Sequence, residues 1–147
     1  GVEGQGKSEM KEEHTIQLES YMITLRNLRN LLSTTKNFYK FVRVSVIVRL
    51  TLAYNCIGVD YQLIGDKDPS FIPKAIEYHT LHEQLADVNG KFLASINLGL
   101  CYDRISDNKN SVYWFQKALT HSVQMANLNG QSLAIGNIGR IGTKSLS

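Results

Sequence analysis

Cysteine and proline are scarce in this sequence, with two of each among 147 residues. Two cysteines cannot staple a small fold, so a disulfide-rich scaffold is excluded, and the low proline content excludes a collagen-like chain. The hydrophobic share of 43% is enough to form a packed core, which excludes a wholly disordered chain. Because Cys56 and Cys101 are far apart and form no framework, we expect a reducing, cytoplasmic location.

Acidic residues are missing from two long stretches, Ser20 to Arg49 and everything after Asp107. The first stretch has six basic residues, and the segment between the two stretches has eight acidic and four basic residues. Solvated helix faces of mixed sign explain such blocks best. The alternative is a phosphate-binding cluster, because aromatic residues interleave with Lys36, Lys40 and Arg43. The formal net charge of +3 is small, so we expect no nucleic-acid partner.

Long uncharged apolar runs are also missing. The most apolar segment, Val44 to Leu52, is interrupted by Arg49, and no run reaches the roughly 18 apolar residues of a membrane span. We therefore expect no membrane span. Since residue 1 is glycine and a patterned segment runs to the last residues, we expect the chain to be part of a longer protein.

An internal repeat is the most informative feature of the sequence. The segment Leu52–Tyr61 aligns with Leu93–Tyr102, 41 residues later, and a third copy begins at Leu133 after a further 40 residues. After each of the first two copies a small residue follows the last apolar position, which is a helix-ending signal. A second amphipathic helical pattern then begins, at Ala75 in one repeat and at Ser111 in the next.

The two complete repeats differ in their connecting loops. The first has a loop five residues longer, residues 67–73, which contains both prolines of the chain, and its second helix is one turn shorter. A period near 40 residues, built of two helices, is typical of a helical solenoid. In such a repeat, Gly58 and Gly99 on the first helices would let the second helices approach closely, with His79 and Phe115 filling the groove beside them.

These positions resemble the tetratricopeptide repeat (TPR) family. Its pattern of a bulky residue, Leu-Gly, Tyr, Ala and an aromatic reads here as Tyr54, Ile57-Gly58, Tyr61, Ala75 and His79, and then as Ser95, Leu98-Gly99, Tyr102, Ser111 and Phe115. The third copy keeps Ile138-Gly139 but lacks the tyrosine. The long period is similar to the branch of the family found in cell-polarity scaffolds and kinesin light chains. The resemblance implies an all-α, right-handed superhelical solenoid of antiparallel helix pairs.

The resemblance also implies a division of the chain. We expect residues 1–15 to be a disordered N-terminal segment and residues 16–36 a leading helix or cap. TPR-like repeats would then fill residues 37–147, as about 44–90, 91–130 and a partial repeat at 131–147. Alternating apolar residues from Val44 to Leu52 are also compatible with a strand. We predict a helix there, because a lone strand in a solenoid has no pairing partner.

Catalytic chemistry finds little support in the sequence. His79, His82 and Glu83 have a spacing that can bind zinc, but His79 occupies the packing position of Phe115 in the next repeat. Cys56 and Cys101 have no partners at fixed spacing, and the glycines after Leu133 are repeat positions on a helix rather than a phosphate loop. We therefore expect no catalytic residue, no metal and no cofactor, and hence no enzyme.

The resemblance implies a binding groove lined by the first helices of the repeats. The inward positions would include Leu52, Val59 and Gln62, then Leu93 and Ile96, and then Leu133 and Gly136. Asn97 and Asn137 match the asparagine with which the long-repeat branch holds a peptide backbone, although bracing of neighbouring helices explains them equally well. The first repeat has Cys56 at that position. The candidate partner-binding residues are Asn55, Asn97, Leu100, Asp103, Asn137 and Arg140.

We accordingly expect a protein-interaction module, a scaffold or adaptor that takes a peptide or partner protein in a concave groove. The alternative is a structural spacer within a larger repeat array, in a cytoskeletal, ciliary or polarity complex. In either case the chain would be part of a larger chain or complex.

Overall fold

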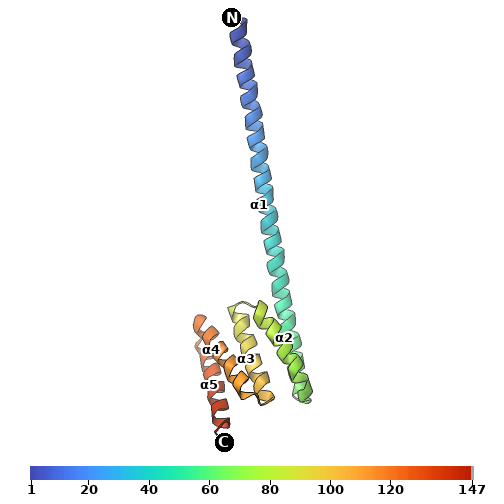
Figure 1. The fold of residues 1–147 in the computed structure, drawn as a ribbon, viewed down its shortest axis with the longest axis vertical. Coiled ribbons are helices and arrows are strands. Elements are labelled where there is room, and N and C mark those ends of the chain that lie inside the picture. Colours follow the sequence, from blue (N-terminus) through green and yellow to red (C-terminus); the bar gives the residue numbers. More distant parts are fainter. Residues whose placement is uncertain (147) are drawn as a thin grey trace. The chain divides into compact units, whose positions relative to one another are not determined.

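The structure is a computed structural model that describes residues 1–146. Within these residues it contains helices and no strand, so the expected all-α class is confirmed (Figure 1). The elements are α1 (Val2–Gly65), a 3-10 turn η1 (Pro69–Phe71), α2 (Ile72–Leu85), α3 (Val88–Arg104), α4 (Asn108–Gln124) and α5 (Leu128–Lys144).

Helix α1 is longer than the sequence analysis anticipated. Residues 2–15, expected to be disordered, are helical, and no break separates residues 16–36 from the first repeat. Many residues of this segment (Glu, Lys, Gln and Met) are good helix formers, and they outweigh the cost of Gly4 and Gly6. Residues 44–52 are helical as predicted, so their alternation of apolar residues does not mark a strand.

The later helices begin at recurring capping residues. The side chains of Asp87, Asp107 and Asn127 accept hydrogen bonds from the backbone N–H three residues further on, at 2.9, 3.1 and 3.0 Å. Ser106 and Ala126, just before two of these caps, have φ values of 62° and 52°. These left-handed residues end the preceding helices. The backbone N–H of the residue after each of them donates to the carbonyl five residues earlier, which closes the turn. The predicted helix end after Ile105 is thus confirmed.

The connection between α1 and α2 contains the turn η1, in which the side chain of Asp68 accepts a hydrogen bond from the N–H of Ser70. Pro73 was expected in this loop but lies in the first turn of α2, where a missing N–H costs nothing. Helix α2 has 14 residues and α4 has 17, so the predicted one-turn difference is confirmed.

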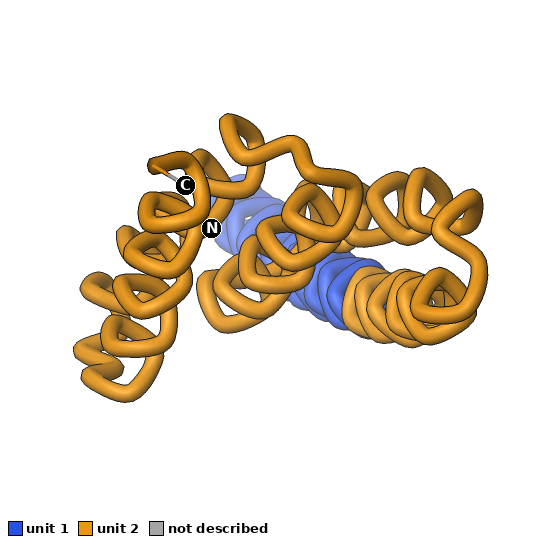
Figure 2. The backbone as a smooth tube through the Cα atoms, turned by 90° about the horizontal axis from the view of Figure 1, so that it is seen from below, with its two compact units in different colours: residues 1–45 blue, residues 46–147 orange. Residues whose placement is uncertain are grey.

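The chain divides into two compact units, Gly1–Ser45 (unit 1) and Val46–Ser147 (unit 2), coloured in Figure 2. In unit 2, α2 packs against α3, α3 against α4, and α4 against α5. One core cluster joins α3, α4 and α5 around Phe115, and a second joins α2 and α3 through Ile72, Ala75 and Cys101.

Glycines let helices of unit 2 approach closely, as predicted. A Cβ at Gly99 would lie 2.8 Å from the ring of Phe115, and one at Gly58 would lie 2.7 Å from the ring of His79. Phe115 and His79 are both fully buried. The repeat in the sequence predicted that these two pairs are equivalent, and the structure packs both pairs in the same way. Ile96 differs from expectation, since it is buried in the core cluster with Phe115 instead of lining a groove.

Candidate functional site

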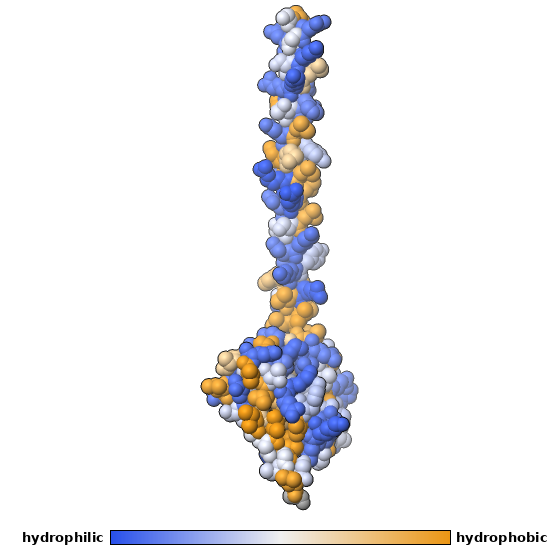
Figure 3. Space-filling model, turned by 60° about the vertical axis from the view of Figure 1, so that its left-hand side comes forward, coloured by the Kyte–Doolittle hydropathy of each residue, from blue (hydrophilic) through white to orange (hydrophobic). Residues whose placement is uncertain are grey.

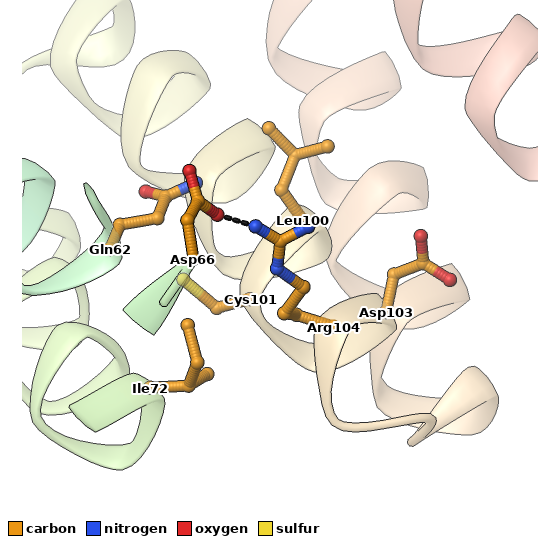
Figure 4. Close-up of a pocket in the computed structure, with 7 residues that line it drawn as sticks. All are labelled: Gln62, Asp66, Ile72, Leu100, Cys101, Asp103 and Arg104. Carbon is orange, nitrogen blue, oxygen red and sulfur yellow. Dashed lines mark ion pairs between the residues drawn. The ribbon is translucent and has the colours of Figure 1, made fainter. Parts of the chain in front are cut away.

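A cavity of about 210 Å³ lies in unit 2 among the C-terminal turns of α1, the start of α2 and the last turns of α3 (Figure 4). Its wall combines apolar and charged side chains. The residues that line it are Gln62, Asp66, Ile72, Leu100, Cys101, Asp103 and Arg104. Leu100 and Asp103 are candidates from the sequence, so two of the six predicted residues lie at this cavity.

Ion pairs connect the helices around the cavity. Arg104 of α3 pairs with Asp66, which follows the end of α1 (Figure 4). Asp103 of α3 accepts hydrogen bonds from Arg140 at 2.8 Å and from Lys144 at 3.2 Å, both on α5. These contacts link the end of α1 to α3 and α3 to α5 through polar side chains, of which Asp103 is largely buried.

The carboxylate of Asp103 is stabilised in its charged form. Partial burial by itself would raise its pKa, but the hydrogen bonds and positive charges of Arg140 and Lys144 outweigh burial and lower the pKa below its ordinary value. Asp103 therefore remains a fixed negative charge at neutral pH, with two cations beside it.

One of the three predicted asparagines, Asn137, is engaged in hydrogen bonds within the protein. The Nδ2 of Asn137 donates to the carbonyl of Leu133 on its own helix at 2.9 Å, and its Oδ1 accepts from Arg140 at 3.0 Å. Asn97 is half-buried on α3. Asn55 is half-buried on α1, and its Oδ1 is buried with no hydrogen-bond partner among the described residues. The structure thus brings Asp103, Asn137 and Arg140 together and leaves Asn55 outside this network.

The sequence analysis missed Asp66 and Arg104 as members of this site. A signal for them was present, because opposite charges on first helices recur at about one repeat period. Asp103 is 37 residues before Arg140 and 41 before Lys144, and Asp66 precedes Arg104 by a similar interval. Charges at this spacing face each other when equivalent helices lie side by side.

The histidines considered as metal ligands serve packing. His79 lies against Gly58, and its Nε2 is 3.1 Å from Oε1 of Gln62. Burial, with a smaller contribution from the nearby His82, lowers the pKa of His79 to about 4. Burial also lowers the pKa of His82. Both imidazoles are therefore neutral at physiological pH, and the Nδ1 atoms of both are buried without a hydrogen-bond partner in the described chain.

Cys101 and Glu83, which the sequence analysis weighed as reactive or metal-binding side chains, have structural surroundings. Burial raises the pKa of the Cys101 thiol to about 12, so it carries no nucleophilic thiolate near neutral pH. Glu83 pairs with Lys91 across 3.7 Å. Within residues 1–146 no three metal-binding side chains come together.

Helix α1 is long and apolar enough, by length and composition alone, to cross a membrane. One such helix is weak evidence, because a signal sequence near the N-terminus or the core helix of a soluble protein meets the same criterion. The absence of a membrane span thus stays a prediction.

Comparisons with known proteins bring no relative to set beside this geometry. No protein-family model matches the chain, and neither a curated protein nor a solved structure matches it.

Proposed function

We propose that the helices of unit 2 form a TPR-like repeat module that binds an extended peptide or a segment of a partner protein, without catalysis. One observation carries the proposal. The same close packing, a glycine of one helix under an aromatic ring of the next, occurs at Gly58 with His79 and again at Gly99 with Phe115. Repeated packing of this kind is how solenoids build an extended binding surface.

The surface that we assign to the ligand is formed by the ends of α1 and α3 and by α5. Leu100 supplies exposed apolar area, and the ion pairs of Asp66 with Arg104 and of Asp103 with Arg140 supply charge. Side-chain amides such as those of Gln62 and Asn97 offer both a donor and an acceptor, which suits the unpaired main-chain groups of an extended peptide.

The test uses the full chain and a peptide library from which the tightest binder is selected. The double variant Asn97→Ala with Leu100→Ala should weaken binding of that peptide by about tenfold in fluorescence anisotropy. The matched control is Gln84→Ala with Gln116→Ala, two exposed amides on α2 and α4. If both double variants bind equally well, or if the chain selects no peptide, the proposal fails.

A second candidate function, a spacer within a larger repeat array, is favoured by an observation on α5. Gly139 aligns with Gly58 and Gly99, but no atom of a neighbouring helix lies within 4 Å of a Cβ placed there. This leaves a close-packing position open to a helix of a neighbouring module. Sedimentation velocity separates the candidates, because a spacer self-associates through this face whereas the peptide-binding module stays monomeric.

A further inference from the structure

A seven-residue pattern runs along α1 within unit 1. Between Leu18 and Val42, apolar or aromatic side chains occupy seven of the eight first and fourth positions of successive heptads, and the exception is Thr35. We call these eight positions the heptad seam: Leu18, Tyr21, Leu25, Leu28, Leu32, Thr35, Tyr39 and Val42. The seam spans more than three heptads, which is the length at which such a pattern indicates a coiled coil.

The heptad seam is uncovered within unit 1. Its seven apolar side chains are between 39% and 68% exposed. Figure 3 shows hydrophobic side chains recurring along this part of the helix beside hydrophilic ones. A single helix in water gains little from its own backbone hydrogen bonds, and helices are stabilised mainly by packing of an apolar face. We therefore expect another molecule to cover this apolar face.

The charges on one side of the seam indicate the chemistry of the molecule that binds there. If Leu18 is position a, all five basic residues between Ser20 and Ser45 fall at positions b and e, which lie on the same side of the seam. They are Arg26, Arg29, Lys36, Lys40 and Arg43. The g positions on the other side are uncharged, namely Thr24, Leu31 and Phe38, and no acidic residue lies in the interval. From Ser20 onward the seam is thus bordered by cations on one side and by neutral side chains on the other.

We propose that the heptad seam binds an amphipathic helix of another protein whose flanking positions are acidic, to form a two-stranded coiled coil. Acidic residues at the partner's flank would pair with Arg29, Lys36 and Arg43, and charges at these positions select partners in coiled coils. This interaction is independent of the peptide-binding surface proposed for unit 2.

Other occupants fit the charge pattern less well. An antiparallel second copy would set the e positions against each other, so that Arg29, Lys36 and Arg43 face like charges. A parallel second copy would leave the cations beside neutral g residues without any acidic partner. Nucleic acid would neutralise the cations but leave the seam uncovered. A lipid surface favours cations on both borders of the apolar face.

The experiment measures binding of the full chain to two synthetic peptides of about four heptads each. Both peptides carry the same leucine and isoleucine seam, and they differ in having glutamate or lysine at all e and g positions. We expect the acidic peptide to bind at least about tenfold more tightly than the basic one, with affinity that falls as salt rises. Equal binding of the two peptides would overturn the proposal.

Variants separate charge pairing from general attraction. The double variant Arg29→Gln with Lys36→Gln should weaken binding of the acidic peptide by about tenfold. Asn30→Glu with Asn37→Glu changes the net charge by the same amount at the outer f positions, and should leave affinity within about twofold. Leu28→Gln with Leu32→Gln should abolish binding while circular dichroism shows that the packed helices persist.

Three results would contradict the proposal in favour of another occupant. A chain that sediments as a dimer and resists the acidic peptide would indicate a second copy. Binding to phosphatidylserine vesicles that excludes the peptide would indicate a membrane surface. Heparin binding that survives the Leu28 and Leu32 substitutions while peptide binding is undetectable would indicate a polyphosphate ligand.

Discussion

The segment of α1 in unit 1 and the helices of unit 2 are all helical, but their apolar side chains differ in exposure. In unit 2, Phe115 and Leu98 are fully buried, whereas Phe38 and Leu32 in unit 1 are exposed. Both regions are helical throughout. The difference shows that helix formation and core formation depend on separate features of the sequence. Unit 2 has turns that bring successive helices together, and unit 1 has none.

The two regions also use charge differently. In unit 2, Asp103 and Asp66 have cations from neighbouring helices beside them. In the Ser20 to Arg49 interval no acidic residue is present to pair with the cations. These two carboxylates of unit 2 are thus paired within the unit, whereas the cations between Ser20 and Ser45 are the ones that we propose an acidic partner pairs with.

The largest expected effect comes from removing a buried aromatic ring. Phe115→Ala should lower the free energy of unfolding by about 3–5 kcal/mol, because it empties the centre of the α3, α4 and α5 cluster. Phe41→Ala, in the exposed segment, should change it by less than about 0.5 kcal/mol. Urea unfolding followed by the fluorescence of Trp114, the single tryptophan, measures both. Similar losses of unfolding free energy for the two variants would show that the exposed and the buried ring contribute equally to stability, against the difference described between the regions.

A pH-dependent loss of stability is the next largest effect. The folded pKa of His79 is about 4 against 6.5 for an ordinary histidine, so the unfolded chain binds the proton first. Stability contributed by neutral His79 is complete above pH 6.5 and is lost as pH falls toward 4. Between pH 7 and pH 5 this amounts to about 2 kcal/mol.

The His79→Phe variant checks the cause of this loss, since it places the ring of the next repeat over Gly58. Urea unfolding at several pH values should show a flatter profile for this variant than for the original chain. His14→Phe, the same change at an exposed position of unit 1, is the matched control and should leave the profile unchanged. A profile that keeps its full slope in His79→Phe would assign the pH dependence to other groups.

The smallest effect compares two glycines of the repeat. Gly99→Ala should destabilise unit 2 by about 1 kcal/mol, since crowding of the Phe115 ring exceeds the gain in helix propensity. Gly139→Ala has open space around it and should instead stabilise the chain by about 1 kcal/mol. Thermal unfolding measures the change in stability of each variant. A change of the same sign in both would mean that the close approach at Gly99 is not needed.

Much of the fold was predictable because its signals are local. The starts of α3, α4 and α5 follow from Asp87, Asp107 and Asn127, whose side chains cap the N–H group three residues further on. The pairing of Gly99 with Phe115 was predictable because the repeat supplies a second example at Gly58. The extent of α1 was not, because several Ser, Thr and Asn residues between residues 15 and 44 could each cap a helix, and no glycine or proline singles out a boundary.

The candidate site was predictable only in part. Leu100 and Asp103 were identified from their repeat positions and lie at the cavity. Asn137 was expected to face a ligand, but its amide bonds within α5 and to Arg140, since a local acceptor costs less entropy than a distant one. Arg104 was not identified because its role depends on its ion pair with Asp66, which lies in the turn after α1.

The sequence by itself determined an all-helical chain, the places where its later helices start and stop, and a repeated contact between glycine and an aromatic ring. These features depend on hydrogen bonds and spacings within a few residues or within one repeat. Only the tertiary structure decided that His79 is buried deeply enough to stay neutral and that Asp103 meets cations of α5. Burial and ion pairing depend on the crossing of helices far apart in the chain, which local periodicity does not specify.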